Sequence, residues 1–418
     1  MKNNMMFKKI STLVATCLTL VLLTSCEDIL SVNDPGAIQS DQLNDPALEQ
    51  LIINGVYSEF QFAFNYLTQS ASILSDEVYT DHTNIDHREF ALFEIRPSNA
   101  LNSATYTNLQ KARVSAEDAV VRFQSFDNPN PVNIAEAYAY AGYANLMLGL
   151  HFCTVPINGG PAQPWQEILN RAVTHFTSAI NTATGGSEAE VRIANMARVG
   201  LGRAHLQLGN DQQAISAVQN VPAGFEFYVY RSSNSSRETN LNAAQWISSD
   251  PWLGVDPRFQ NLNDPRLRHI EQPKFGLNSN PVYVPFRPRA YQGWTADEDQ
   301  PIDLNTGYIL ASGLEARYII AEASGANSQT LALVNERRAV GNQDAVNLSG
   351  GELMAELREQ KARDFFLTVH RLADLRRYLD RYGVDMFPSG NYPFGNSAYG
   401  SARCFIIPQS ELSGNPNL

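Results

Sequence analysis

The strongest constraint on the fold of this chain is a helical periodicity that continues almost without a break from residue 106 to residue 219. Apolar and small residues recur there at intervals of three and four, which is the spacing of one face of an α-helix. One such stripe consists of Leu109, Ala112, Ala116, Val120 and Phe123. Small residues recur where helices would cross and let two helices approach closely, so the pattern predicts a mainly α fold built of helical hairpins.

One part of this stretch resembles a known repeat. Residues 197–215 read as a small-residue helix, a Leu-Gly-Asn turn and a second helix with an inward-facing Ala214, which is similar to a tetratricopeptide repeat. The repeat is degenerate, because no strict period of about 34 residues is present and an insert at 152–165 separates the hairpins. Helical periodicity returns at 311–340 and at 351–380.

The chain divides into regions of different character. Within the helical region 47–220, residues 75–105 are rich in Asp, His, Asn and Thr, which predicts a long exposed loop or a few short turns. Residues 221–310 form an insertion rich in proline and aromatic residues. The last region, 311–418, holds C-terminal helices and a tail at 381–418 rich in Gly, Pro and Asn, which we expect to lie extended along the surface.

The insertion carries nine of the 21 prolines and three of the four tryptophans. Prolines at this density forbid long helices and predict turns and short strands lying on the helical scaffold. Aromatic rings in such loops can cover the apolar faces of sugar rings, while amide and guanidinium groups bond the hydroxyls. The candidate ligand-binding residues are Trp246, Trp252, Tyr291, Trp294, Arg287 and Asn242, with Arg289 as a further polar candidate.

An alternative interpretation exists for each of these aromatic residues. A large ring in a long loop can also serve as an anchor that fixes the loop to the helices beneath it. The fourth tryptophan, Trp165, has a helical context, and we assign it to packing.

The first 25 residues have the pattern of a secretory signal. Lys2, Lys8 and Lys9 precede a mostly apolar stretch at 10–23. As a helix this stretch would cover about 21 Å, less than the roughly 30 Å of a bilayer core, so it reads as the apolar part of a signal peptide.

The residues that follow predict a lipid anchor. Leu23-Thr24-Ser25-Cys26 resembles the bacterial lipobox, so we expect cleavage after residue 25, acylation of Cys26 with chains such as palmitate, and a tether over 26–46. Glu27 and Asp28 resemble the surface-export signal of lipoproteins in the Bacteroidetes and relatives. The alternative is an ordinary secretory signal with a chance cysteine.

Two further cysteines, Cys153 and Cys404, remain in the exported body. An oxidising compartment permits a disulfide between them. The alternative is a pair of buried thiols that act as small hydrophobic residues. The sequence leaves both open, because it does not place the two Cα atoms relative to each other.

Charge and motifs narrow the classes of function. The net charge of −12 argues against nucleic acid as a partner. The sequence has no P-loop, dinucleotide-binding, serine-hydrolase or zinc-protease motif, and no cofactor is predicted. An all-α glycosidase remains an alternative, since paired carboxylates need no local motif, and Asp76, Glu77 and Asp81 are the acidic cluster to test first. Polar clusters at 81–87 and 297–303 are candidates for a divalent cation, with plain hydrophilic loops as the alternative.

Several features together resemble one family. The lipobox, the broken tetratricopeptide-like helices and the aromatic insertion are joined by four C-terminal patterns. These are EARYIIAEA (315–323), LVNERR (333–338), HRLADLRR (370–377) and IIPQSEL followed by NPN (406–417). In this combination the chain resembles the SusD/RagB family of nutrient-binding outer-membrane lipoproteins.

The resemblance implies a fold and a function. The fold would be a scaffold of tetratricopeptide-like hairpins with the loop-rich insertion. The function would be a non-catalytic binder, anchored by lipid on the exterior of the outer membrane, that captures oligosaccharides for a SusC-like TonB-dependent transporter. A peptide ligand, as for a RagB-type importer subunit, is the alternative. Charged helix residues such as Arg371, Asp374 and Arg377 would then be scaffold salt bridges. A third class of function is a scaffold that binds another protein through a concave helical face.

Overall fold

The computed structural model describes residues 42–80, 83–248, 251, 253–272 and 281–418. The predicted signal peptide, Cys26, most of the predicted tether, Asp81 and Trp252 lie outside the described residues. None of the helices within the described ranges combines the length and the apolar character that a membrane crossing needs.

The chain forms two units, residues 1–48 and residues 49–418. The described part of the first unit holds two short 3-10 turns, η1 (Gln42–Asn44) and η2 (Pro46–Leu48). The second unit contains all the elements discussed below.

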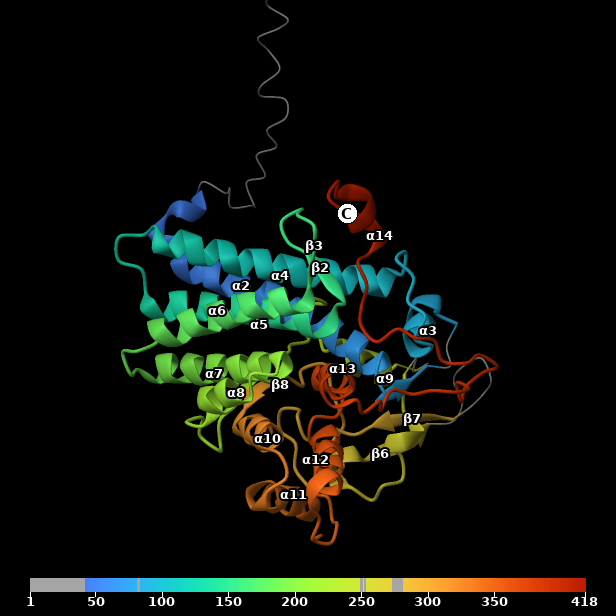
Figure 1. Cartoon of the computed structure of the whole chain (residues 1–418). Helices are drawn as coiled ribbons and strands as arrows, with labels where there is room; N and C mark the ends of the chain where they lie inside the picture. The colour runs from blue at the N-terminus through green and yellow to red at the C-terminus, as the bar shows by residue number, and fades with distance from the viewer. Residues whose placement is uncertain (1–41, 81–82, 249–250, 252, 273–280) are drawn as a thin grey trace, which may run out of the picture. The chain divides into compact units, whose positions relative to one another are not determined.

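A layer of helices forms the first half of the second unit (Figure 1). Each helix packs on its neighbours in the order α2 on α4, α4 on α5, α5 on α6, α6 on α7 and α7 on α8. Their bounds are α2 (Glu49–Ile73), α4 (Ala100–Gln124), α5 (Pro131–His151), α6 (Trp165–Thr182), α7 (Glu188–Leu208) and α8 (Asp211–Val218). The insert at 152–165 forms the hairpin β2 (Thr154–Pro156) with β3 (Ala162–Pro164). The predicted helical hairpins are therefore present.

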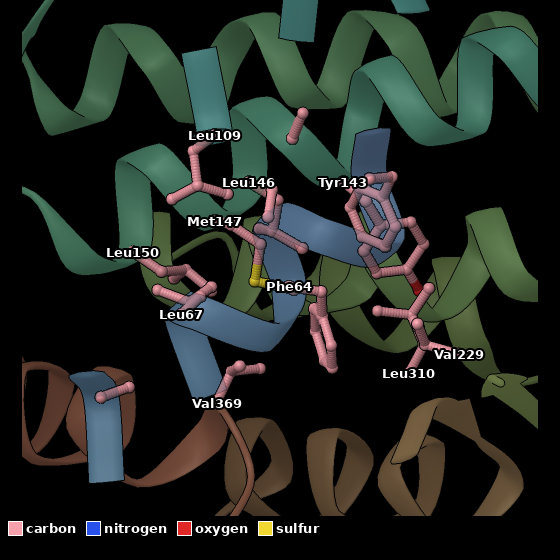
Figure 2. Packing of buried hydrophobic residues seen from close by; sticks show 14 of the residues in the cluster. Phe64, Leu67, Leu109, Tyr143, Leu146, Met147, Leu150, Val229, Leu310 and Val369 are labelled. Atoms are coloured by element: carbon pink, nitrogen blue, oxygen red, sulfur yellow. The ribbon is translucent and has the colours of Figure 1, made fainter. Parts of the chain in front are cut away.

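The predicted stripes form the core of this layer. Figure 2 shows Leu67 of α2, Leu109 of α4 and Leu146 of α5 meeting in one buried cluster. Close helix crossings depend on glycine: a Cβ atom added at Gly200 would lie 2.3 Å from a ring atom of Phe176. Interiors are packed too densely to absorb such an overlap, so small residues at the crossings are required. Trp165 packs against this core, as predicted.

Of the two alternatives for 75–105, the long exposed loop is wrong, whereas short turns do occur between a strand and two helices. Residues 75–80 are buried and include β1 (Val78–Tyr79). A short helix, α3 (Ile85–Ala91), follows, and α4 begins at Ala100. Two of the polar residues that suggested a loop are helix caps: Asn84 accepts hydrogen bonds from the first turn of α3, and Asn99 does so for α4.

The insertion has the predicted turns and short strands. Its described helix, α9, has six residues. The strands pair in twos, with β4 antiparallel to β8, β6 to β7, and β5 to β1. The bounds are β4 (Glu226–Val229), α9 (Leu241–Trp246), β5 (Gly254–Val255), η3 (Pro257–Phe259), η4 (Pro265–Leu267), β6 (His269–Gln272), β7 (Val282–Pro285) and β8 (Tyr308–Ser312).

The C-terminal helices are held by buried ion pairs. Arg371 bonds Asp76 at 2.5 Å, and Arg377 bonds Glu322 at 2.7 Å and Asp374 at 2.6 Å. The prediction that Arg371, Asp374 and Arg377 are scaffold salt bridges is confirmed. The helices are α10 (Gly313–Ser324), α11 (Ser328–Val340), α12 (Gly350–Asp364), α13 (His370–Tyr382) and α14 (Gln409–Gly414).

The C-terminal tail is linked covalently to the helical layer. Cys153 and Cys404 form a disulfide with their Cα atoms 5.3 Å apart, so the first of the two alternatives for these residues holds. Phe405 beside the bridge is fully buried. The tail is mostly extended, as predicted, but at Phe405 it enters the core instead of lying only on the surface.

Candidate functional site

Three of the predicted binding residues belong to the core. Trp246 is 3% exposed, Tyr291 is 1% exposed and Asn242 is fully buried. The Tyr291 hydroxyl donates a hydrogen bond to the carbonyl oxygen of Leu367 at 2.8 Å. The prediction that these residues present open surfaces to a ligand is wrong, because the insertion has little regular structure and its large side chains fix it to the helices. The anchor alternative holds for both rings.

The other predicted residues lie nearer the surface. Arg287 donates hydrogen bonds to the carbonyl oxygens of Gln292 at 3.2 Å and Pro301 at 3.1 Å, so it braces the loop between them. Trp294 on this loop is half-buried, and the Arg289 guanidinium lies 5.5 Å from its ring centroid. One aromatic ring with a neighbouring cation is too small to make the predicted platform.

The insertion does contain a hollow, which we call the insertion groove. Its volume is about 560 Å³, within the range of ligand pockets in proteins. Amides, carboxylates, one guanidinium and two aromatic rings line it. The lining side chains used below are Asn261, Asn263, Asp264, Arg268, His269, Phe286, Asp297, Asp299 and Asn342.

Three asparagines at the groove have left-handed backbone. The φ angles of Asn261, Asn263 and Asn342 are +56°, +50° and +55°, a conformation that asparagine tolerates better than most residues. The side chains of Asn261 and Asn263 are exposed. Each offers an amide donor and an acceptor at the mouth of the groove.

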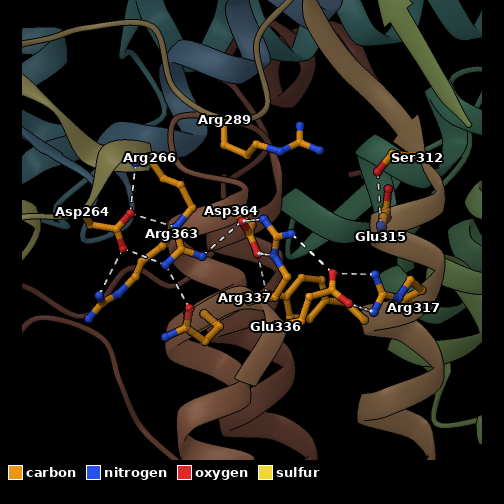
Figure 3. Close-up of polar contacts among 12 residues, drawn as sticks. Asp264, Arg266, Arg289, Ser312, Glu315, Arg317, Glu336, Arg337, Arg363 and Asp364 are labelled. Carbon is orange, nitrogen blue, oxygen red and sulfur yellow. Dashed lines mark hydrogen bonds and ion pairs between the residues drawn. The ribbon is translucent and has the colours of Figure 1, made fainter. Parts of the chain in front are cut away.

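A buried, ion-paired carboxylate lies beneath the groove. The Asp264 carboxylate is fully buried and accepts hydrogen bonds from Arg266 at 2.6 Å and Arg363 at 3.3 Å (Figure 3). Burial alone would raise the pKa of Asp264, but the hydrogen bonds and charge of Arg266 outweigh it and hold the pKa below its ordinary value. Asp264 therefore stays ionised and is not suited to donate a proton.

One wall of the groove is closed by an ion pair. Arg268 lies 3.2 Å from Asp299 and also donates to the carbonyl oxygen of Ala296. In the same way, Arg287 lies 3.5 Å from Asp303. Arginine thus faces two of the carboxylates in the cluster considered for a cation. Among the described residues, no group of three or more His, Cys, Asp or Glu side chains is placed to hold a metal ion.

Asp76 and Glu77, the two described residues of the acidic cluster considered for glycosidase chemistry, are held in structural contacts. Both oxygens of Asp76 are bonded by Arg371 at 2.5 Å. Glu77 is fully buried, and its carboxylate accepts a hydrogen bond from the Leu367 backbone N–H at 2.9 Å. Burial raises the pKa of Glu77. Neither carboxylate lines the insertion groove. Because Arg371 bonds both oxygens of Asp76, Asp76 and Glu77 are not placed as a pair of catalytic carboxylates.

Comparison with known proteins identifies the architecture. No protein-family model and no curated protein matches the sequence. Solved structures do match. A SusD homolog from Bacteroides thetaiotaomicron has a TM-score of 0.69 at 13% identity, over 92% of this chain and 99% of its own.

Two further structures carry descriptions of binding. A SusD-like carbohydrate binding protein from Bacteroides vulgatus has a TM-score of 0.68 at 13% identity, over 90% of this chain and 97% of its own. A laminarin binding SusD-like protein has a TM-score of 0.64 at 15% identity, over 88% of this chain and 99% of its own. Likeness over nearly the whole length of both partners confirms the predicted architecture, and the chain has the SusD-like fold.

Proposed function

We propose that this protein is a non-catalytic, lipid-anchored binder of oligosaccharides that delivers its ligand to a SusC-like TonB-dependent transporter at the outer membrane. The SusD-like fold over about nine-tenths of the chain carries the proposal. Among the similar structures, one is a carbohydrate binding protein and one binds laminarin. The lipobox-like segment ending at Cys26 supports the anchor, and Glu27 and Asp28 after it support export to the cell exterior.

The insertion groove is the binding site of this proposal. Amides of Asn261, Asn263 and Asn342 can both donate to and accept from sugar hydroxyls. The rings of His269 and Phe286 offer surfaces for apolar sugar faces. Asp264, Arg268 and Asp299 are paired with other residues, and only Asp297 among the charged lining residues has no described ion pair. A site of neutral amides and mostly paired charges suits a neutral, polyhydroxylated ligand better than a charged one.

The amides at the mouth of the groove allow a direct test. Replacing both Asn261→Gly and Asn263→Gly removes two hydrogen-bonding side chains while glycine keeps the left-handed backbone. Two hydrogen bonds predict a loss of affinity on the order of tenfold or more, with little change in melting temperature. The measurement is calorimetric titration of the full-length lipoprotein in detergent with maltoheptaose, laminarihexaose and xylohexaose, and an assay for released reducing ends.

A matched control distinguishes the loss of the groove side chains from the general effect of placing glycine at a left-handed position. Asn158 has the same backbone conformation, with φ +52°, outside the groove, and it accepts a hydrogen bond from Arg113 at 2.9 Å. Asn158→Gly should cost some stability and leave affinity unchanged. The proposal fails if no oligosaccharide binds, or if reducing ends accumulate with any that does.

A further inference from the structure

A second hollow lies where β4 covers the N-terminal parts of α2, α5 and α7. We call it the tyrosine groove. Its volume is about 350 Å³, and it shares no lining residue with the insertion groove. Four tyrosines, a carboxylate and a guanidinium carry its chemistry, namely Tyr57, Tyr140, Tyr228, Tyr230, Glu136 and Arg192.

Two of the tyrosines form an open aromatic surface. Tyr230 is 44% exposed and Tyr228 is half-buried, and their ring centroids are 6.1 Å apart. The Tyr228 side chain and the Tyr230 backbone are held from behind. The Tyr228 hydroxyl donates to Glu226 at 2.5 Å, and the Tyr230 backbone N–H donates to the Tyr57 hydroxyl at 3.0 Å. A ring fixed as that of Tyr228 is loses little conformational entropy when a flat apolar surface packs on it.

A hydroxyl that no described residue bonds lines the same groove. The Tyr140 side chain is 1% exposed, and its hydroxyl makes no hydrogen bond to any described residue. The hydroxyl oxygen is not one of the fully enclosed unpaired atoms of the described residues, so it opens to the groove. By contrast, the Tyr57 hydroxyl accepts from the Tyr230 backbone and still has its own hydrogen to donate. Two phenol groups are therefore available to a ligand inside the groove.

Charges of both signs stand beside these hydroxyls. The Glu136 carboxylate is half-buried and forms no ion pair with a described residue. Burial raises the pKa of Glu136, and the positive charge of Arg192 lowers it by a smaller amount. The guanidinium of Arg192 lies 4.7 Å from the ring centroid of Phe227. An ionic ligand of either sign would meet a like charge, whereas a neutral sugar can bond to both groups.

We propose that the tyrosine groove is a second carbohydrate-binding site, which takes a neutral pyranose unit with its apolar face on Tyr228 and Tyr230 and its hydroxyls on Tyr140, Tyr57, Glu136 and Arg192. The inference rests on the proposed function in that both grooves serve one glycan-binding protein. Two separate sites in one chain allow a long polysaccharide to be held at two points, which raises avidity without any change in either site.

The unpartnered hydroxyl gives a sharp test. Tyr140→Phe removes one oxygen that no described protein group uses, so the melting temperature should stay the same while affinity at this site falls about three- to tenfold. Tyr230→Ala removes an exposed ring and should lower affinity at this site on the order of tenfold. Calorimetric titration uses the same three oligosaccharides with the full-length lipoprotein carrying Asn261→Gly and Asn263→Gly, so that the insertion groove is weakened and the tyrosine groove contributes more of the binding that remains.

Tyr143→Phe is the matched control. The Tyr143 hydroxyl is buried and donates to the carbonyl oxygen of Met196 at 2.8 Å, so this variant should lower the melting temperature and leave binding intact. Residual binding in the Asn261, Asn263 double variant that Tyr140→Phe and Tyr230→Ala both reduce supports the second site. If the double variant loses all binding, or if neither tyrosine variant changes what remains, the second site is refuted and the proposed function stands. If the wild type binds no oligosaccharide, both proposals fall.

Discussion

The two grooves differ in what holds their walls. The tyrosine groove is built from rings on packed helices and one strand, so its shape depends on the helical core. The insertion groove is built from turns, and its residue Asp264 is fixed by Arg266 of η4 and by Arg363 of the C-terminal helix α12. Loops that carry a site need such bracing from elsewhere in the molecule, because they have few hydrogen bonds of their own. Different substitutions should therefore weaken ligand binding at the two grooves.

The largest difference between the two grooves is expected when the buried carboxylate of Asp364 is replaced. Arg266 lies 3.2 Å and Arg337 2.8 Å from it, and the Tyr318 hydroxyl donates to it at 2.6 Å (Figure 3). Asp364→Asn removes the buried counter-charge of Arg337 and one of the two carboxylates that face the buried Arg266. We expect a loss of about 3–5 kcal/mol in the free energy of unfolding, measured by urea denaturation. Asp364→Asn should lower affinity at the insertion groove more than affinity at the tyrosine groove.

An exposed ion pair between neighbouring helices provides the control. Glu336 accepts two hydrogen bonds from Arg317, at 2.8 Å and 2.5 Å, and both side chains are largely open to water. Glu336→Gln should change the free energy of unfolding by less than about 1 kcal/mol. Equal losses for Asp364→Asn and Glu336→Gln would mean that burial of the charges does not brace the insertion.

Acid should destabilise the contact between helices α7 and α10. Glu315 on α10 is buried and bonds Arg203 on α7 at 2.5 Å. Burial opposes ionisation of Glu315, but Arg203 and His370 outweigh it and lower its pKa from 4.5 to about 2. The unfolded chain therefore binds this proton first, and the stabilisation present above pH 4.5 is lost as the pH falls toward 2.

The size of this acid effect can be measured by urea unfolding at pH 7, 4.5 and 3. A shift of this size in a buried group corresponds to about 3 kcal/mol in total. Glu315→Gln should be less stable than the wild type at neutral pH, because Arg203 loses its partner, and should depend less on pH over the same range. A wild-type midpoint that stays constant down to pH 3 would contradict this assignment.

How far the sequence predicts these features depends on whether a local pattern determines them. The helical stripes, such as the one through Leu109 and Phe123, are local, and the helices formed where the stripes lie. The polar residues of 75–105 do not reveal their role, because asparagine is frequent both in loops and at helix caps, and Asn99 is a cap. Capping depends on the backbone that follows it, and composition alone does not reveal that backbone.

The candidate site was harder to predict than the fold. Tyr291 and Tyr230 are both tyrosines of the same insertion, but one is buried and the other 44% exposed, and burial depends on contacts distant in the sequence. A usable signal is present in β4 and the residue after it, where Phe227 and Val229 are buried and alternate with Tyr228 and Tyr230. This period of two marks one inward and one outward face. The left-handed asparagines of the insertion groove have no such pattern.

The smallest effect should come from Trp294, the predicted platform residue that remains partly open to water. It lines neither groove, and its described contact is with Arg289. Trp294→Ala should lower the free energy of unfolding by about 0.5–1 kcal/mol, the value of a partly exposed cation–π contact. Oligosaccharide affinity should remain at the wild-type value in the same titrations. A clear loss of affinity without a loss of stability would instead restore the aromatic platform of the insertion as the binding surface, because Trp294 would then contact the ligand directly.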